Sequence, residues 1–229
     1  YDDYFPFNAD GQPWEQMRDI RRHGQDAALT LTLDCSLSDD ELREVARMLR
    51  PYGSMTIRIN HECGGTWFTH NKRFTYEQVG KFFAHFSDII HQEAPNVRTV
   101  FCAGFAQADG KLEKEDEFAV AYRAADVWSA DCYLALHYGW PYDVAEVGGG
   151  QYKADSVGMY YDMFCRTYER ASSQFGCKPL VTAEFNTDGD VTGPRHQGES
   201  VIRLAETFRD HKADWFKAIS LYQQPGSRH

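Results

Sequence analysis

Two glutamates in this sequence stand at the ends of apolar, β-rich runs. Glu62 follows the run at 55–60, and Glu184 follows the run at 179–183. Two carboxyl groups facing each other across a cleft are what glycoside hydrolysis requires: one protonates the leaving oxygen, and the other attacks the anomeric carbon or activates a water. One such glutamate alone is more often a salt-bridged or solvated loop residue, but two at one end of a sheet favour catalysis.

Other polar and aromatic residues share this position at the ends of predicted strands. They are Asp34 and Cys35; Asn60 and His61; Gly104 and Phe105; Asp131, Tyr133 and then His137; Phe185 and Asn186; and Tyr222, Gln223 and Gln224. In a parallel α/β barrel the catalytic groups lie at the carboxyl ends of the strands. These residues are therefore the candidates for a site.

The elements that would position them alternate between strand and helix. Six strands are predicted at 28–33, 55–60, 97–103, 127–133, 179–183 and 216–222, and helices at 14–23, 38–50, 75–93, 156–174 and 197–211. Ser38 and Glu41 have the spacing of a capping box, and the charged stretch 111–117 is predicted to be a solvated loop. This alternation is typical of a parallel α/β fold, either an open doubly wound sheet or a closed (β/α)8 TIM barrel.

The barrel needs eight strands and typically about 250 residues. The 229-residue chain supplies six strands. We therefore expect a single catalytic barrel domain over 1–229, with strands three to eight present and the first two missing. The polar and aromatic opening, Tyr1 to Phe7, does not resemble a natural N-terminus and agrees with missing upstream residues.

Composition excludes several functions. With 42% hydrophobic and 25% charged residues, the chain is of the globular class. Its net charge of −10 argues against a nucleic-acid partner, which requires a basic face. No apolar run reaches the roughly 18 residues of a membrane-spanning helix, so no membrane partner is expected. The 14% aromatic residues fit either a large core or a sugar-binding cleft.

The six cysteines show no CxxC pair and no zinc-ligand spacing, so no metal or other cofactor is expected. An even number permits disulfides, with Cys165–Cys177 the favoured pair, while buried free thiols have equal weight. We expect a monomer in an extracellular or periplasmic setting.

The residues around Glu62 resemble a known family. The segment 58–68 reads RINHECGGTWF, which is similar to the acid/base motif of glycoside hydrolase family 26, Arg-x-x-His-Glu-x-Asn-Gly-x-Trp. Arg58, His61, Gly65 and Trp67 match it together with Glu62, whereas the chain has Gly64 at the motif's Asn.

Two weaker matches follow in the family's order. Residues 126–133 resemble its sixth strand, with Ser129 at a Gly of the pattern, and 182–185 resemble its nucleophile strand. The resemblance covers roughly Ala27 to Tyr222. The family belongs to the large clan A of retaining (β/α)8 hydrolases with glutamates after strands four and seven, so the resemblance implies the barrel of the two α/β architectures.

The resemblance also implies roles. Glu62 would be the general acid/base and Glu184 the nucleophile, with Tyr133 hydrogen-bonded to Glu184 to keep it ionised and oriented. The substrate would be a polysaccharide or oligosaccharide, with β-mannan the commonest in the family. The residues expected to bind substrate are Arg58, His61, Trp67, Tyr133, His137, Trp140 and Tyr222. Strand alternation places Arg58 on the face of Glu62, where a structural ion pair is the alternative role. His137 and Trp140 are predicted on a loop.

Two other functions stay open. His61, Glu62, Asp131, His137 and Glu184 offer carboxylate and imidazole ligands for a metal-dependent barrel enzyme, although no HxH or HExxH spacing supports it. The departures at Gly64 and after the last strand, where Tyr222 stands in the place of a clan Trp, leave room for a non-catalytic glycan-binding protein.

Overall fold

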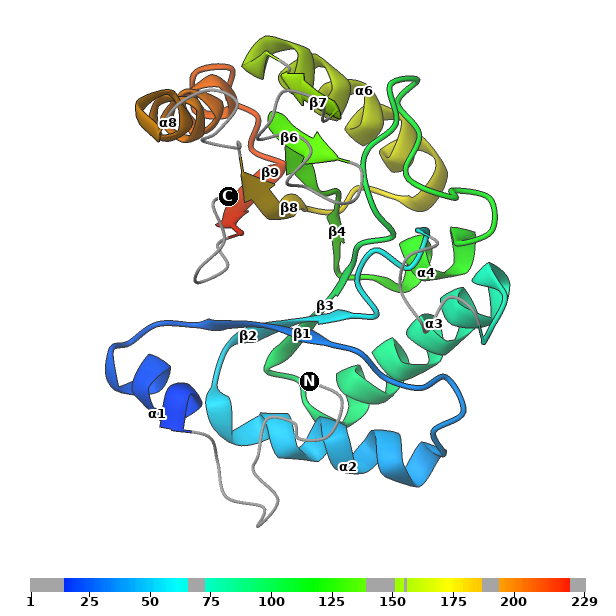
Figure 1. The fold of residues 1–229 in the computed structure, drawn as a ribbon. Helices are drawn as coiled ribbons and strands as arrows, with labels where there is room; N and C mark the ends of the chain where they lie inside the picture. The colour runs from blue at the N-terminus through cyan, green and yellow to red at the C-terminus, as the bar shows by residue number, and fades with distance from the viewer. Residues whose placement is uncertain (1–14, 66–72, 139–150, 155, 187–193, 223–229) are drawn as a thin grey trace. The chain divides into compact units, whose positions relative to one another are not determined.

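The computed structural model describes residues 15–65, 73–138, 151–154, 156–186 and 194–222 (Figure 1). The chain forms two compact units. Unit 1 comprises Tyr1–Gly104 and Glu113–Ser129, and unit 2 comprises Phe105–Leu112 and Ala130–His229.

The described residues of unit 1 form four parallel strands that pair in chain order. They are β1 (Ala27–Leu31), β2 (Met55–Ile59), β3 (Val97–Phe101) and β4 (Val127–Ser129). The register sets Leu31 beside Ile59 and Arg58 beside Val100. Because the strands are parallel, their carboxyl ends share one edge of the sheet.

In the part of unit 1 that the structure describes, five helical segments accompany these strands: α1 (Glu15–Arg22), α2 (Asp39–Leu49), the short 3-10 helix η1 (Arg50–Tyr52), α3 (Tyr76–Glu93) and α4 (Ala119–Ala124). The capping box expected at Ser38 and Glu41 opens α2, and Thr75 with Gln78 forms a second one at α3. The buried face of α3 supplies much of the core, whose largest members are Phe83, Phe86, Phe101, Phe118, Tyr122 and Trp128.

Unit 2 has a parallel set of β5 (Cys132–Tyr133), β8 (Leu180–Asn186) and β9 (Phe216–Leu221), in which β8 pairs with both others. An antiparallel pair, β6 (Ala135–Tyr138) and β7 (Gln151–Ala154), follows β5. The helices α6 (Val157–Phe175) and α8 (Pro194–Asp210) lie side by side (Figure 1). Phe164 of α6 and Phe208 of α8 pack against each other and against Phe216 of β9.

The six predicted strands are present, with two corrections. The strand expected over 127–133 is interrupted, because β4 ends at Ser129 and β5 begins at Cys132, while Asp131 between them forms an isolated bridge to Phe105. His137 was expected on a loop and lies instead in β6.

The stretch 111–117 is not the solvated loop that its charges predict. Leu112 and Glu115 are buried within it, and Phe118 directly after it is fully buried and is the N-cap residue of α4. Two large apolar side chains anchor the segment, so its charged residues surround a packed turn rather than a free loop.

The expected Cys165–Cys177 disulfide is wrong, since all six cysteines are free. Cys165 lies in the middle of α6 and Cys177 lies beyond its end. The intervening helix alone extends about 15 Å, which is far more than the Cα separation of about 7 Å that a disulfide can bridge.

Among the described residues, none of the helices combines the length and the apolar character needed to cross a membrane.

Candidate functional site

Glu184 lies near the carboxyl end of β8 with only 9% of its surface exposed. The Tyr133 hydroxyl, at the end of β5, donates a hydrogen bond of 2.9 Å to its Oε2 atom. The hydroxyl of Tyr160 in turn donates to the Tyr133 carbonyl at 2.8 Å. The Tyr133–Glu184 hydrogen bond expected from the resemblance is thus present, and a bond to a carboxylate of this kind fixes its orientation.

Two further rings flank Tyr133 at this edge of unit 2. The centroid of Phe105 lies 6.1 Å from that of Tyr133, and the ring of Tyr222 meets Tyr133 edge-on at 6.4 Å. Tyr222 follows β9 and is 40% exposed. Phe105, Tyr133 and Tyr222 form what we call the aromatic cluster, which offers partly accessible rings beside the Glu184 carboxylate.

Asn186 ties the strand ends together. Its Nδ2 donates to the Tyr222 carbonyl at 2.9 Å, and its Oδ1 accepts a hydrogen bond of the same length from Gln197 Nε2. The Tyr222 amide donates to the Phe185 carbonyl at 3.0 Å. Because these bonds join β8, β9 and α8, the residues after Glu184 hold Tyr222 in place.

Asp131 is a second acidic group in unit 2 and is fully buried. One of its carboxylate oxygens lies within 4.8 Å of one from Glu184. Carboxylates are ligands of hard divalent cations. Among the described residues of unit 2, Asp131 and Glu184 are therefore the two members of the predicted metal site that lie close to each other.

In unit 1, Glu62 lies on the turn that follows β2 and is 7% exposed. Its φ angle is +50°, in the left-handed region that non-glycine residues seldom adopt. Two hydrogen bonds fix this turn to the end of β3: the Glu62 amide donates to the Cys102 carbonyl at 2.9 Å, and the Gly64 amide donates to the Ala103 carbonyl at 2.7 Å.

Asn60 anchors the same turn to the end of β1. Its amide donates to the Leu31 carbonyl at 2.7 Å, and its side-chain Oδ1 accepts from the Leu33 amide at 2.7 Å. Asn60 also has a left-handed φ of +49°, which asparagine tolerates well. The turn that carries Glu62 is therefore bonded to the neighbouring strand end on each side.

The structure accounts for the chain's departure at Gly64. A Cβ atom there would lie 2.5 Å from Glu113 Cγ and 2.7 Å from the Ala103 carbonyl oxygen. Both distances are far inside van der Waals contact. The Asn of the resembled motif does not fit this position, because its space is occupied by a neighbouring side chain and by backbone.

The structure describes only some of the other residues that are predicted to bind substrate. Arg58 is half-buried, and its Nε donates to Thr30 Oγ1 of β1 at 3.1 Å. His61 is partly exposed beside Glu62. Trp67 and Trp140 lie outside the described residues, as does the side chain of His137. Their roles stay predictions.

The thiols at this edge of unit 1 are not poised for nucleophilic chemistry. Burial raises the pKa of Cys35 to about 12, with the Asp34 charge adding to the effect. Burial also raises the pKa of the Cys63 thiol. The pKa of Asp34 is lowered by hydrogen bonds from Ser36 and by Arg73, whose Nη1 lies 2.7 Å from Oδ2. Thiols are nucleophilic as thiolates, so these two stay inert at neutral pH.

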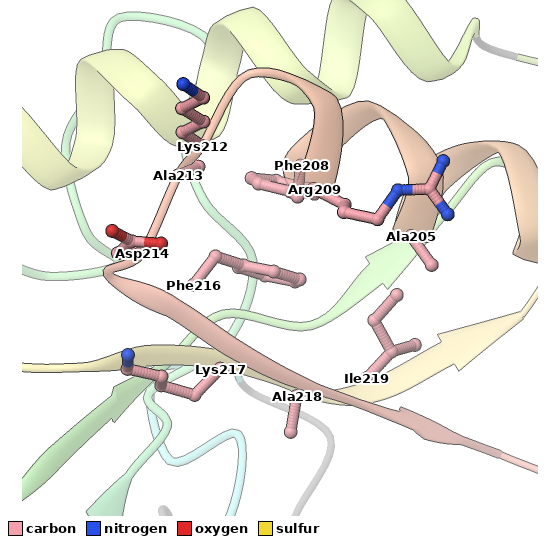
Figure 2. Close-up of a pocket in the computed structure, with 10 residues that line it drawn as sticks. All are labelled: Ala205, Phe208, Arg209, Lys212, Ala213, Asp214, Phe216, Lys217, Ala218 and Ile219. Atoms are coloured by element: carbon pink, nitrogen blue, oxygen red, sulfur yellow. The ribbon is translucent and has the colours of Figure 1, made fainter.

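A hollow of about 440 Å³ lies elsewhere in unit 2, between α8 and β9 (Figure 2). Its lining combines Phe208, Phe216 and Ile219 with the cations Arg209 and Lys212. It reaches the start of β9 rather than the strand ends, and it contains none of the predicted site residues. We therefore place the candidate site at the carboxyl ends of the strands.

Comparisons with known structures show that this fold is similar to that of barrel glycoside hydrolases. A GH26 β-mannanase from Bacteroides ovatus matches 94% of this chain with a TM-score of 0.60 and 13% identity. The catalytic domain of a GH53 protein from Ignisphaera aggregans matches 95% of this chain, and 71% of its own, with a TM-score of 0.56 and 14% identity.

A β-glucuronidase from Bacteroides uniformis, covalently bound to cyclophellitol-6-carboxylate aziridine, matches 96% of this chain with a TM-score of 0.59 and 10% identity. This chain spans 65% of the mannanase and 25% of the glucuronidase. No family model and no curated protein matches the sequence. The likenesses confirm the predicted α/β-barrel fold and, at the level of fold, the resemblance to clan A hydrolases.

Sequence reasoning missed one residue of the unit 1 edge. Glu113 was assigned to a solvated loop, yet its side chain fills the space next to Gly64. The only sequence signal is the pair of large apolar residues, Leu112 and Phe118, that flank the charged stretch. The four acidic residues between them make the stretch resemble a solvated loop.

Proposed function

We propose that the protein is a retaining β-glycoside hydrolase that cleaves a polysaccharide or oligosaccharide, with Glu184 as nucleophile and Glu62 as acid/base. The observation that supports this most is the buried Glu184 carboxylate, held by the Tyr133 hydroxyl at the carboxyl end of a parallel strand. In parallel barrels this edge carries the catalytic groups.

The first step would form a covalent intermediate. The Glu184 carboxylate attacks the anomeric carbon as the glycosidic C–O bond breaks, and Glu62 transfers its proton to the departing oxygen. The Tyr133 hydrogen bond keeps Glu184 oriented for the attack. A carboxylate aligned in advance loses little freedom in the transition state.

The second step would release the sugar. Glu62, now a carboxylate, removes a proton from a water molecule that attacks the anomeric carbon, and the bond to Glu184 breaks. Two inversions leave the product with the configuration of the substrate. No cofactor is needed for this chemistry.

For the substrate we favour a β-mannan-type glycan. The support is the motif at 58–68, which resembles family 26, together with the fold-level likeness to a β-mannanase. The partly exposed rings of Phe105 and Tyr222 suit the apolar faces of sugars. Polymeric glycans do not cross membranes, so we propose an extracellular or periplasmic location, and a monomer as the working unit.

A glycan-binding protein without turnover is the second candidate. The feature that favours it is Gly64, which departs from the acid/base motif and cannot accept that motif's side chain. Binding of β-mannan without any released product would establish this alternative in place of hydrolysis.

The experiment is a screen of β-mannan, xylan and mixed-linkage glucan for released oligosaccharides, with and without a chelator. We expect β-mannan to be cleaved equally in both. Glu184→Gln should abolish turnover and leave glycan binding intact, and Tyr133→Phe should lower kcat about ten- to a hundredfold, the value of a hydrogen bond to a charged group. The exposed Glu199→Gln on α8 is the matched control and should keep full activity.

Full activity in Glu184→Gln would contradict the proposal. Loss of activity on chelation would instead favour a metal site that includes Asp131 and Glu184.

A further inference from the structure

The side chain of Glu113 is enclosed by two glycines that follow neighbouring strands. A Cβ atom on Gly64, beyond β2, would lie 2.5 Å from Glu113 Cγ. A Cβ atom on Gly104, beyond β3, would lie 3.2 Å from the same Cγ and 3.6 Å from Glu113 Cβ. The methylene groups of Glu113 therefore pack directly on the backbone at both strand ends, where any larger residue would displace them.

The backbone of Glu113 is fixed as firmly as its side chain. Its carbonyl accepts a hydrogen bond of 2.7 Å from the Tyr122 hydroxyl, and Tyr122 is 1% exposed in the core of unit 1. The indole of Trp128 donates to the Tyr122 carbonyl at 2.9 Å. Glu113 is thus held by a core tyrosine while its half-buried side chain covers the two glycines.

The chain at Gly64 belongs to the turn of Glu62. The amides of Glu62 and Gly64 donate to the Cys102 and Ala103 carbonyls, and the Gly65 amide donates to the Glu62 carbonyl at 3.0 Å. Glu113 lies over the Gly64–Ala103 link of this network. It occupies the volume into which the Asn of the resembled motif would extend.

We propose that Glu113 is a positioning residue that holds the Glu62 turn against the end of β3 by packing its methylenes on Gly64 and Gly104. The inference deepens the proposed function, because a fixed turn keeps the Glu62 carboxyl where the leaving oxygen is protonated. It also explains why the chain has glycine at 64: the loop after β3 supplies the packing, so position 64 itself carries no side chain.

Hydrogen exchange tests the packing without relying on activity. We expect Glu113→Ala to accelerate exchange of the Glu62 and Gly64 amides about fourfold, the effect of losing the Cγ methylene group, which alanine lacks. Glu113→Gln keeps both methylenes and should exchange like the wild type. Glu117→Ala, an exposed acidic residue of the same segment, is the control and should change nothing.

Unchanged exchange in Glu113→Ala would overturn the proposal. An equal acceleration in every peptide of unit 1 would also overturn it, since it would show a general loss of stability. Failure of Glu113→Gln to match the wild type would assign the effect to the charge and not to packing.

Leaving-group dependence tests the consequence for Glu62. 2,4-Dinitrophenolate departs without protonation, whereas a sugar hydroxyl needs the general acid. We expect Glu113→Ala to lower kcat/KM about tenfold for a mannooligosaccharide and to leave 2,4-dinitrophenyl β-mannobioside within about twofold of wild type. Equal losses on both substrates would contradict positioning. If the wild type cleaves neither substrate, the proposed function fails, and the exchange result alone decides the role of Glu113.

Discussion

Glu62 combines a nearly buried carboxyl group with a left-handed backbone angle of +50°. Such a conformation costs a non-glycine residue roughly 1–3 kcal/mol and persists only where the surroundings enforce it. Here the enforcing contacts are the hydrogen bonds from the turn to the ends of β1 and β3. Glycine would adopt the same angle without strain.

Because the backbone at Glu62 is strained, replacing this residue with glycine should relieve the strain while removing the catalytic carboxyl group. Glu62→Gly should be more stable than Glu62→Ala by about 1 kcal/mol, because only glycine relieves the left-handed strain. Both variants should lose general-acid catalysis. Urea unfolding measures the free-energy difference, with the wild type as reference. An alanine variant as stable as the glycine variant would show that the backbone at this position is not strained.

At this residue scale, the sequence predicted the hydrogen bond between Tyr133 and Glu184. Glu184 with its Tyr133 partner could be read from strand ends and a motif, because parallel strands bring their carboxyl ends together. The contact of Glu113 with Gly64 could not, since it depends on how a loop distant in sequence folds back. From the sequence alone, Gly64 was recognisable as a departure from the resembled motif, but the reason for this departure was not.

Among the elements, α2 and α3 are joined through one carboxylate. Glu93 at the end of α3 accepts hydrogen bonds from Arg47 at 3.0 and 3.1 Å and from Arg43 at 2.9 Å, and Arg50 donates to its backbone carbonyl. The hydrogen bonds from Arg47 and Arg43 lower the pKa of Glu93 from 4.5 to about 2. The pairs fix the helix ends beside each other.

This depressed pKa makes the contribution of Glu93 dependent on pH. The carboxylate is favoured in the folded state, so its stabilising effect is fully present above the unfolded pKa of 4.5 and is lost as pH falls towards 2. We predict that Glu93→Gln is less stable than wild type at pH 7 and that the difference shrinks below pH 4.5, as measured by denaturant unfolding across this range.

A double-mutant cycle supplies the control for Glu93. Arg47→Ala should cost less stability in the Glu93→Gln background than in the wild type at pH 7, because the partner is already gone. A stability difference between Glu93→Gln and wild type that stays constant from pH 7 to pH 2 would contradict the role of the ion pairs.

Helices with strong local signals were the easiest elements to predict. Ser38 and Glu41 fix the start of α2 through contacts only three residues apart, so the sequence alone determines them. The break at Asp131 and the β6–β7 pair depend instead on distant partners. The burial of Leu112 was also missed, because the surrounding sequence is charged. The free energy gained by burying one large apolar side chain exceeds the preference of its charged neighbours for water.

For the whole molecule, two observations support a barrel-like fold. Both units contain parallel strands, and the fold is similar to that of barrel hydrolases. The chain spans 65% of the length of the mannanase, so its activity and its substrate stay proposals. The proposed hydrolysis requires two carboxyl groups from different strands. The proposal therefore depends on the distance between a residue of unit 1 and one of unit 2.

The separation of the Glu62 and Glu184 carboxyl groups in a crystal structure tests this claim most directly. We predict about 5–5.5 Å, the distance at which one carboxylate attacks the sugar while the other protonates the leaving oxygen. A separation of about 9 Å would leave room for a water and would indicate inversion instead. Carboxyl groups at opposite ends of the strands would contradict the account.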